Sequence, residues 1–178
     1  MPETLAQSPR PSRRWLEILK IFVVGRRPRR TLVRAAVLAV TCYLVFTFVL
    51  LPVRVTGVSM EPTYHDHSIN FSNRLAYLFR EPRRGDVVTI RYAGIHDMLM
   101  KRIIGLPGET VSFVHGRVLI NGAPLEEPYE NGPCHWNIPA VKLDATEYFV
   151  VGDNRSMRWQ DHVFGKTNRA RIVGKILL

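Results

Sequence analysis

The stretch VSFVHGRVLINGAPL, residues 111–125, decides the fold class that this sequence predicts. Short apolar runs lie on both sides of His115-Gly116 and have the length and composition of β-strands. His115-Gly116 and, further along, Asn121-Gly122 are both turn signals. The stretch therefore predicts a tight β-hairpin that is followed at once by a second reversal of the chain.

Outward from this hairpin, the chain beyond Gly57 repeats the same alternation of short apolar runs and turns. The strand-like runs are DVVTIRY at 86–92, TVSFV at 110–114, RVLI at 117–120 and EYFVV at 147–151. The connections are too short for helical crossovers between parallel strands, and the sequence shows no internal repeat. We therefore predict one mostly β domain of about 125 residues, large enough to close a hydrophobic core without disulfides or metals.

The segment AAVLAVTCYLVFTFVLLPV, residues 35–53, contains nineteen residues without a charge between Arg34 and Arg54. A membrane-spanning helix needs about 20 apolar residues, and this segment is apolar all round. A cleavable signal peptide would be shorter and would be followed by a site with small residues, whereas bulky residues follow here. The segment predicts a transmembrane helix.

The distribution of charge predicts the orientation of this helix and excludes nucleic-acid binding. The formal net charge is +10, but residues 1–34 carry nine Lys/Arg against two Glu, and five of the arginines lie within nine residues before Ala35. By the positive-inside rule, residues 1–34 form a basic cytoplasmic arm, residues 35–53 cross the membrane, and residues 54–178 form an outer domain. That domain is only mildly basic and has no recognised nucleic-acid-binding motif.

Within the arm, Trp15, Ile18, Leu19 and Phe22 recur at helical spacing. This spacing predicts either a short amphipathic helix on the inner leaflet or, as the plain alternative, a basic tail without structure. The two cysteines, Cys42 in the apolar segment and Cys134 in the outer domain, allow no disulfide within that domain.

Two residues of the outer domain could perform nucleophilic chemistry. Ser59 lies in GVSMEPT at 57–63, close to the membrane, although a serine beside glycine and proline is also a common turn residue. Lys101 follows three apolar residues and precedes Arg102, so it is either partly buried, with a pKa lowered by burial and by the neighbouring cation, or a strand lysine that extends to water. A neutral lysine can take the proton of a serine hydroxyl, so this pair is chemically sufficient.

Histidine chemistry is the alternative. A Ser59/His162/Asp161 triad is not expected, because adjacent residues of an extended segment point in opposite directions. His65 and His67 could share a face as metal ligands, but no third ligand accompanies them at a recognisable spacing. We therefore expect no metal and no other cofactor.

Four ordered motifs behind the apolar segment resemble those of the type I signal peptidases. These motifs are GVSMEPT at 57–63, RRGDVVTI at 83–90, KRIIGLPGE at 101–109 and VVGDNRS at 150–156. The resemblance, which covers residues 55–176, implies a β-rich Ser/Lys protease fold with Ser59 as nucleophile, Lys101 as general base and pockets for small substrate side chains.

The resemblance also implies supporting residues for the site. It implies that Met60 packs near the nucleophile and that Asp153 pairs with Arg102, which would otherwise be an uncompensated charge. Gly57 stands where some relatives carry a serine that helps to bind the oxyanion, so backbone N–H groups, that of Ser59 first, should take this role. The remaining residues that we assign to site support are Pro62, Gly152, Asn154 and Arg155.

The chain departs from the family pattern after Arg155. The family usually has a serine, an aspartate and an arginine where an ungapped reading gives Arg158, Gln160 and His162. The serine that normally orients the lysine is thus missing, and Ser156 or Asp161 are the candidate substitutes. The short span between Lys101 and Gly152 leaves no room for a large inserted subdomain, which indicates a minimal version of the fold.

The resemblance implies a membrane-anchored serine endopeptidase that cleaves signal peptides from exported precursor proteins at the outer face of the membrane. Its expected partners are these precursors, membrane lipid and, transiently, the export machinery. Two alternatives are a dedicated peptidase of the pilin-processing or conjugation type and a non-catalytic homologue that only binds export partners. The altered segment after Arg155 motivates the second alternative.

Overall fold

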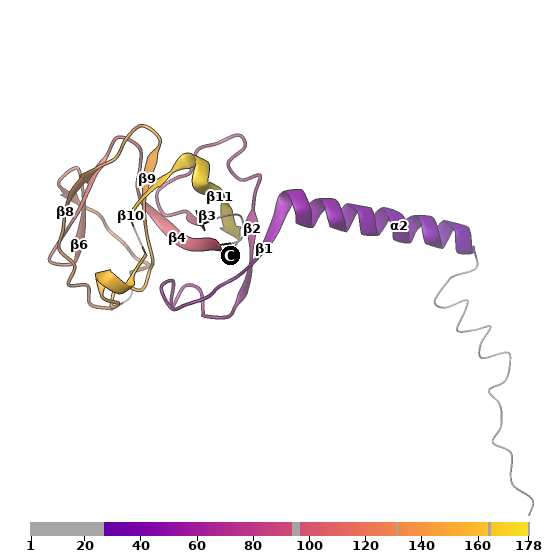
Figure 1. Cartoon of the computed structure of the whole chain (residues 1–178), viewed down its shortest axis with the longest axis horizontal. Coiled ribbons are helices and arrows are strands. Elements are labelled where there is room, and N and C mark those ends of the chain that lie inside the picture. Colours follow the sequence, from indigo (N-terminus) through magenta and orange to yellow (C-terminus); the bar gives the residue numbers. More distant parts are fainter. Residues whose placement is uncertain (1–26, 94–96, 131, 164, 178) are drawn as a thin grey trace, which may run out of the picture. The chain divides into compact units, whose positions relative to one another are not determined.

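The computed structural model describes residues 27–93, 97–130, 132–163 and 165–177 (Figure 1). The arm before residue 27, with its predicted amphipathic helix or unstructured tail, lies outside the described residues. The chain divides into two units, one up to Val45 and one from Phe46 onward, and each is described separately.

The first unit contains helix α2, which runs from Pro28 to Leu44 and is followed by a π-helical turn, η1, from Val45 to Val49. Pro28 lies at the start of the helix, where its missing N–H group costs no hydrogen bond. The stretch Pro28–Val49 is long and apolar enough to cross a membrane, with a mean hydropathy of 2.2 over its best window. None of the residues of α2 is buried against other parts of the protein.

The helical stretch begins and ends earlier than the sequence predicted. Leu50–Val53, expected at the end of the transmembrane helix, belong instead to strand β1 (Leu50–Arg54). Pro52 explains this difference, because proline lacks the N–H group that a helix interior requires and is tolerated in an edge strand. β1 is the edge strand of its sheet and pairs with β2 through Leu50–Arg54.

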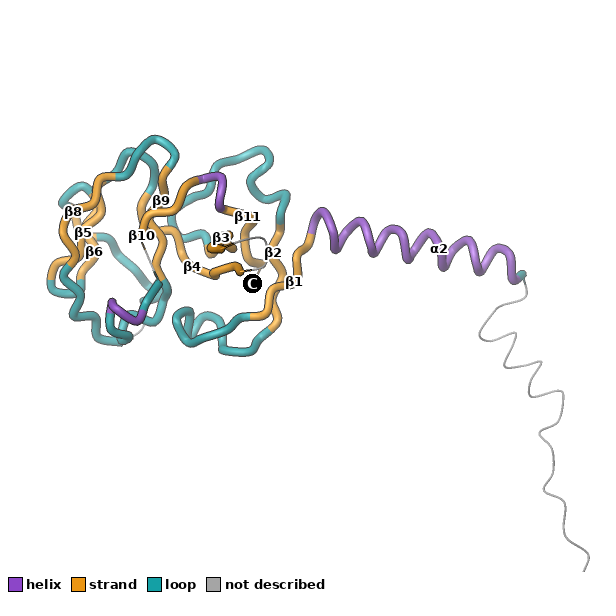
Figure 2. The backbone as a smooth tube through the Cα atoms, in the orientation of Figure 1, coloured by secondary structure: helices purple, strands orange, loops and turns teal. Residues whose placement is uncertain are grey.

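The second unit contains a seven-stranded sheet in which all neighbouring strands are antiparallel. In spatial order its strands are β1, β2 (Ile69–Asn73), β11 (Ile172–Leu177), β3 (Val87–Ala93), β4 (Asp97–Gly105), β9 (Glu147–Val151) and β10 (Gly165–Asn168). Apart from strands and loops, the described residues of the second unit beyond η1 form only the short 3-10 turns η2 (Trp159–Asp161) and η3 (Arg169–Arg171) (Figure 2). The prediction of a mostly β domain is confirmed.

A smaller antiparallel sheet is formed by the strands β7 (Ala123–Pro124), β6 (Arg117–Ile120), β5 (Thr110–Val114) and β8 (Ile138–Lys142). β5 and β6 are the predicted hairpin, and β7 is the strand after the second predicted turn. Both turns need a left-handed backbone: φ is 48° at His115 and 81° at Gly116, then 52° at Asn121 and 85° at Gly122.

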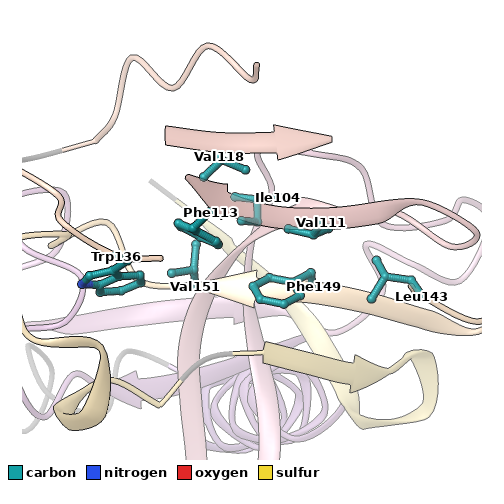
Figure 3. Packing of buried hydrophobic residues seen from close by; sticks show 8 residues of the cluster. All are labelled: Ile104, Val111, Phe113, Val118, Trp136, Leu143, Phe149 and Val151. Atoms are coloured by element: carbon teal, nitrogen blue, oxygen red, sulfur yellow. The ribbon is translucent and has the colours of Figure 1, made fainter. Parts of the chain in front are cut away.

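The two sheets share one hydrophobic core, drawn in Figure 3. The larger sheet contributes Ile104 from β4 and Phe149 and Val151 from β9, and these pack with Phe113 of β5 and Trp136. Val111, Val118 and Leu143 complete the cluster. β4 is therefore bordered by β3 up to Arg102 and by β9 from Arg102 onward, and Ile104 packs it into this core.

Candidate active site

Ser59 and Lys101 meet although they lie far apart in the sequence. Ser59 belongs to the segment between β1 and β2, and Lys101 lies in β4, opposite Val88 of β3. The Nζ atom of Lys101 is 2.6 Å from the Oγ atom of Ser59, which is a hydrogen bond. The two residues that the sequence suggested as nucleophile and base thus lie in one site.

The segment that carries Ser59 is anchored on each side of the serine. Before it, Gly57 adopts a φ of 95°, which favours glycine, and its N–H group donates to Oδ1 of Asp66 at 2.8 Å. After it, Met60 is buried in a cluster with Val55 and Tyr64. Packing of Met60 near the nucleophile agrees with the expectation from the sequence, and it places the adjacent serine at the edge of an apolar wall. Pro62 follows in the same segment and is exposed.

The Lys101 side chain is almost completely buried, with 3% of its surface exposed. Burial lowers its pKa to about 8, because the ammonium form loses its hydration, while the carboxylate of Asp153 acts in the opposite direction. The sequence suggested that the charge of Arg102 would also lower this pKa. Arg102 is instead neutralised by Asp153, so the charge that acts on Lys101 is the carboxylate, and burial alone produces the decrease.

The expected pair between Arg102 and Asp153 is present and bidentate. Nε of Arg102 donates to Oδ1 at 2.8 Å and Nη2 donates to Oδ2 at 2.6 Å. Asp153 is fully buried, and its Oδ2 also accepts a hydrogen bond of 2.6 Å from the hydroxyl of Thr63. The guanidinium carbon of Arg102 lies 4.0 Å from the centre of the Tyr129 ring, a cation–π contact. Sequence reasoning missed both residues: Thr63 ends the motif GVSMEPT but was given no role there, and Tyr129 lies outside the four motifs.

The segment GDNR, residues 152–155, holds the backbone on both sides of Ser59. The N–H group of Asn154 donates to the carbonyl of Ser59 at 3.1 Å, and its side-chain amide donates to the carbonyl of Val58 at 3.1 Å. Gly152 approaches so closely that a Cβ atom there would lie 2.1 Å from the Ser59 oxygen. Only glycine therefore fits at this position.

Arg155 supports the same turn from within. Its Nε donates to the carbonyl of Gly152 at 2.9 Å, and its two terminal nitrogens bind the carboxylate of Glu127 at 3.0 and 2.5 Å. Both side chains of this pair are buried. Glu127 is a further supporting residue that sequence reasoning missed, because it lies in the connection between β7 and β8 and only the fold brings it to Arg155.

The segment after Arg155 differs from what the sequence suggested. The hydroxyl of Ser156 donates to Oδ1 of Asn154 at 2.6 Å, and the carboxylate of Asp161 pairs with the side chain of Arg158 at 2.8 Å. Both proposed substitutes for the lysine-orienting serine thus bond elsewhere. His162 is buried, whereas Asp161 is exposed, so the two side chains point apart, as expected, and the histidine triad is not formed.

A small cleft lies directly at Ser59 and Lys101. One wall is the segment Val53–Met60, and the other is β4 from Met98 to Lys101. In this part of β4 the structure pairs the strand with β3, whereas its pairing with β9 begins at Arg102. Among the described residues, no three His, Cys, Asp or Glu side chains gather as metal ligands.

The comparisons with known proteins all identify signal peptidases as relatives of this chain. The profile of the family described as "Signal peptidase, peptidase S26" matches residues 29–178. The chain is 35% identical over 140 residues to signal peptidase I of Leptolyngbya laminosa, covering 74% of this chain and 69% of that protein. It is 33% identical over 171 residues to the probable signal peptidase I-2 of Synechocystis, covering 93% and 72%. It is 32% identical over 142 residues to signal peptidase I V of Bacillus subtilis, covering 72% and 84%.

Replacing the buried aspartate tests how much the Arg102–Asp153 pair contributes to stability. We expect Asp153→Asn to lower the free energy of unfolding by about 3–5 kcal/mol, because the buried guanidinium loses its counter-charge. Asp161→Asn is the matched control, since Asp161 pairs with Arg158 at the surface, and should cost less than about 1 kcal/mol. Urea titrations of the full chain in detergent measure both. Equal losses would show that the buried pair has no special weight.

Proposed function

The chain belongs to the signal peptidase family, peptidase S26, and on that premise we propose that Ser59 is the nucleophile and Lys101 the general base of signal-peptide cleavage. The protein is a signal peptidase I that acts on precursor proteins carrying signal peptides. A dedicated pilin-processing role and a non-catalytic role are not favoured. The observation that carries the mechanism is the 2.6 Å contact between Lys101 Nζ and Ser59 Oγ.

The chemistry follows from that contact. Neutral Lys101 takes the hydroxyl proton as the Ser59 oxygen attacks the scissile carbonyl carbon, and the resulting ammonium gives the proton to the departing amine. The signal peptide is then bound to Ser59 as an ester. Lys101, neutral again, takes a proton from water as the water oxygen attacks the ester carbon, and returns the proton to Ser59.

Backbone groups stabilise the negative oxygen of each tetrahedral intermediate in this proposal. The N–H group of Gly57 is engaged by Asp66, so the N–H group of Ser59 is the first candidate donor. The hydrogen bonds from Asn154 to the carbonyls of Val58 and Ser59 support it by holding the peptide units on both sides of the nucleophile.

An extended precursor segment fits the cleft between residues 53–60 and β4. The edge of β4 at Met98–Met100 could accept it as an added strand, which orients the scissile bond through main-chain hydrogen bonds. The three methionine and leucine side chains there make the wall apolar. Small residues before the cleavage site would pack against this wall, as the family resemblance implies.

The protein is a single-pass membrane protein, and we further propose its orientation. The arginines before residue 35 stay in the cytoplasm, the helical stretch up to Val49 crosses the membrane, and the residues from Arg54 onward are outside. The proposed boundaries therefore differ from the expected ones, because the span ends at Val49 and Leu50–Arg54 form β1. The export machinery would deliver precursors to this side.

An apolar surface of the outer domain is proposed to touch the lipid. Arg74 links this surface to the end of the helical stretch: its Nη1 donates to the carbonyl of Thr47 at 2.6 Å and its N–H group to that of Val49 at 2.9 Å. Leu75, Leu78 and Phe79 follow directly and are exposed, Phe79 to 93%. If Val49 ends the membrane span, these side chains begin at the level of the bilayer surface, where burial in lipid is favourable.

Cleavage of a model precursor by the detergent-solubilised full chain tests the Ser/Lys mechanism. We expect Ser59→Ala to be inactive and Lys101→Arg to lose at least about 1,000-fold, because a guanidinium keeps its proton. The rate should rise with pH through the lysine pKa of about 8. Lys166→Arg makes the same change at an exposed lysine and should leave the rate unchanged. Near-normal cleavage by Lys101→Arg would refute the mechanism.

Orientation is tested by labelling introduced cysteines in intact cells with an impermeant maleimide, after Cys42 and Cys134 are replaced by alanine. A cysteine at the exposed residue Asn121 should be labelled, and one at Ser12 should react only after lysis, because the arginine-rich side stays inside. The reverse pattern would contradict the proposed orientation.

Lipid contact is tested with an environment-sensitive fluorophore on a cysteine at Phe79, in the same cysteine-free background, in vesicles that contain quenchers on their acyl chains. We expect strong quenching at position 79, because its side chain is apolar and almost fully exposed. The matched probe at Asn121 should be quenched little. Equal quenching at the two positions would argue against the lipid-facing surface.

A further inference from the structure

The side chain of His162 is buried next to the proposed site and has no part in the mechanism so far. It follows the turn η2 and is only 4% exposed. Its ring packs edge-on against Trp136, with ring centres 5.1 Å apart and an interplanar angle of 78°. The indole nitrogen of Trp136 donates to the carbonyl of Met157 at 2.8 Å. The imidazole is therefore held in one orientation by a ring that is itself fixed.

The imidazole receives a hydrogen bond from the turn that supports the nucleophile. The N–H group of Gly152 donates to Nε2 of His162 at 2.9 Å. Because Nε2 must keep its lone pair for this bond, the ring proton is on Nδ1. Burial, and after it the charges of Lys101 and Arg155, lower the pKa of His162 to about 3, so the ring is neutral at the pH at which Lys101 titrates.

Gly152 lies between this ring and the nucleophile's backbone. A Cβ atom on Gly152 would be 2.1 Å from the carbonyl oxygen of Ser59 and 2.5 Å from Nε2 of His162. The next residue, Asp153, binds Arg102 and Thr63. A displacement of the imidazole would therefore reach the serine through a single residue.

Three residues after Arg155 depart from the family pattern that the chain otherwise resembles, and of these three only His162 is buried. Arg158 and Gln160 are exposed, and Arg158 pairs with Asp161. His162 is buried, and its ring lies beside Gly152, which approaches the Ser59 carbonyl closely.

We propose that His162 is a positioning residue of the reaction, whose buried imidazole accepts the hydrogen bond of the Gly152 N–H group and thereby fixes the turn that touches Ser59. The inference rests on the proposed Ser/Lys mechanism. The imidazole, backed by Trp136, fills the buried space beside Gly152, and in this proposal it keeps water from the neighbouring base.

The charged and polar groups around Lys101 and His162 determine how a substitution at position 162 affects the site. The base faces the Ser59 hydroxyl and the Asp153 carboxylate, and the imidazole faces Lys101 and Arg155, the latter paired with Glu127. A smaller residue at 162 lets water reach Lys101, and hydration of the ammonium moves the lysine pKa back toward its ordinary value. The Gly152 amide also loses its buried acceptor, which loosens the turn at Ser59.

The experiment compares His162→Ala and His162→Gln in the full chain, with precursor cleavage measured from pH 6 to 10. We expect His162→Ala to lower kcat about 10–100-fold with KM within about twofold, because a buried acceptor is lost. The rising limb of the pH–rate profile of this variant should shift to higher pH by roughly 0.5–1 unit, because water reaches the lysine. His162→Gln offers Oε1 to the Gly152 amide and should recover most of kcat, with the limb near the wild-type position. His135→Gln, at an exposed histidine, is the control and should match the wild type.

Three results would overturn the proposal. His162→Ala could cleave at the wild-type rate, or both variants could lose activity equally with no shift of the limb, which would leave His162 a packing residue only. If His162→Ala does not fold, the test depends on His162→Gln. A decrease in the kcat of this variant beyond about 10-fold would refute the role, because glutamine still offers an acceptor to the Gly152 amide. Failure of the Ser/Lys mechanism is distinguishable, because it appears as activity of Lys101→Arg.

Discussion

The buried ion pair between Arg102 and Asp153 holds the candidate site together. Arg102 follows Lys101 on β4, and Asp153 follows Gly152 at the end of β9, so the pair joins the strand of the base to the turn that touches the nucleophile. Thr63, from the nucleophile's own segment, donates to the same carboxylate. Three distant segments thus converge on one buried charge, and a buried charge without its partner costs several kcal/mol. This cost makes the arrangement close to all-or-none.

The same pair also affects the base, and two opposing effects meet there. Burial of Lys101 favours its neutral form, whereas the Asp153 carboxylate favours the ammonium. Burial is the larger effect, and the pKa of Lys101 falls to about 8. One pKa unit corresponds to about 1.4 kcal/mol of differential interaction. Small changes in the packing around this amine therefore change how much of it is neutral.

Lys101 is held in a fixed position by close packing where the two sheets meet. Gly105 ends β4 where the chain passes into the smaller sheet, and a Cβ atom there would lie 2.5 Å from Val111 and 2.9 Å from both Leu143 and Phe149. The close packing at Gly105 allows the core residues of both sheets to interlock. Lys101 lies four residues earlier on the same strand, so the core holds the base in place without an inserted subdomain.

Sequence alone determined the features that depend on a few neighbouring residues. The hairpin and second turn at 111–125, the mostly β class, the apolar segment and the Ser59/Lys101 pair were all readable, because turn residues, periodicity and motifs act locally or are family signatures. Only the tertiary structure decided where the helical stretch ends, since Leu50–Arg54 became a strand by pairing with β2. It also decided that Glu127 pairs with Arg155 and that His162 is buried against Gly152. Burial, charge neutralisation and hydrogen bonding between distant segments depend on how the chain packs, and no local pattern of residues encodes those distances.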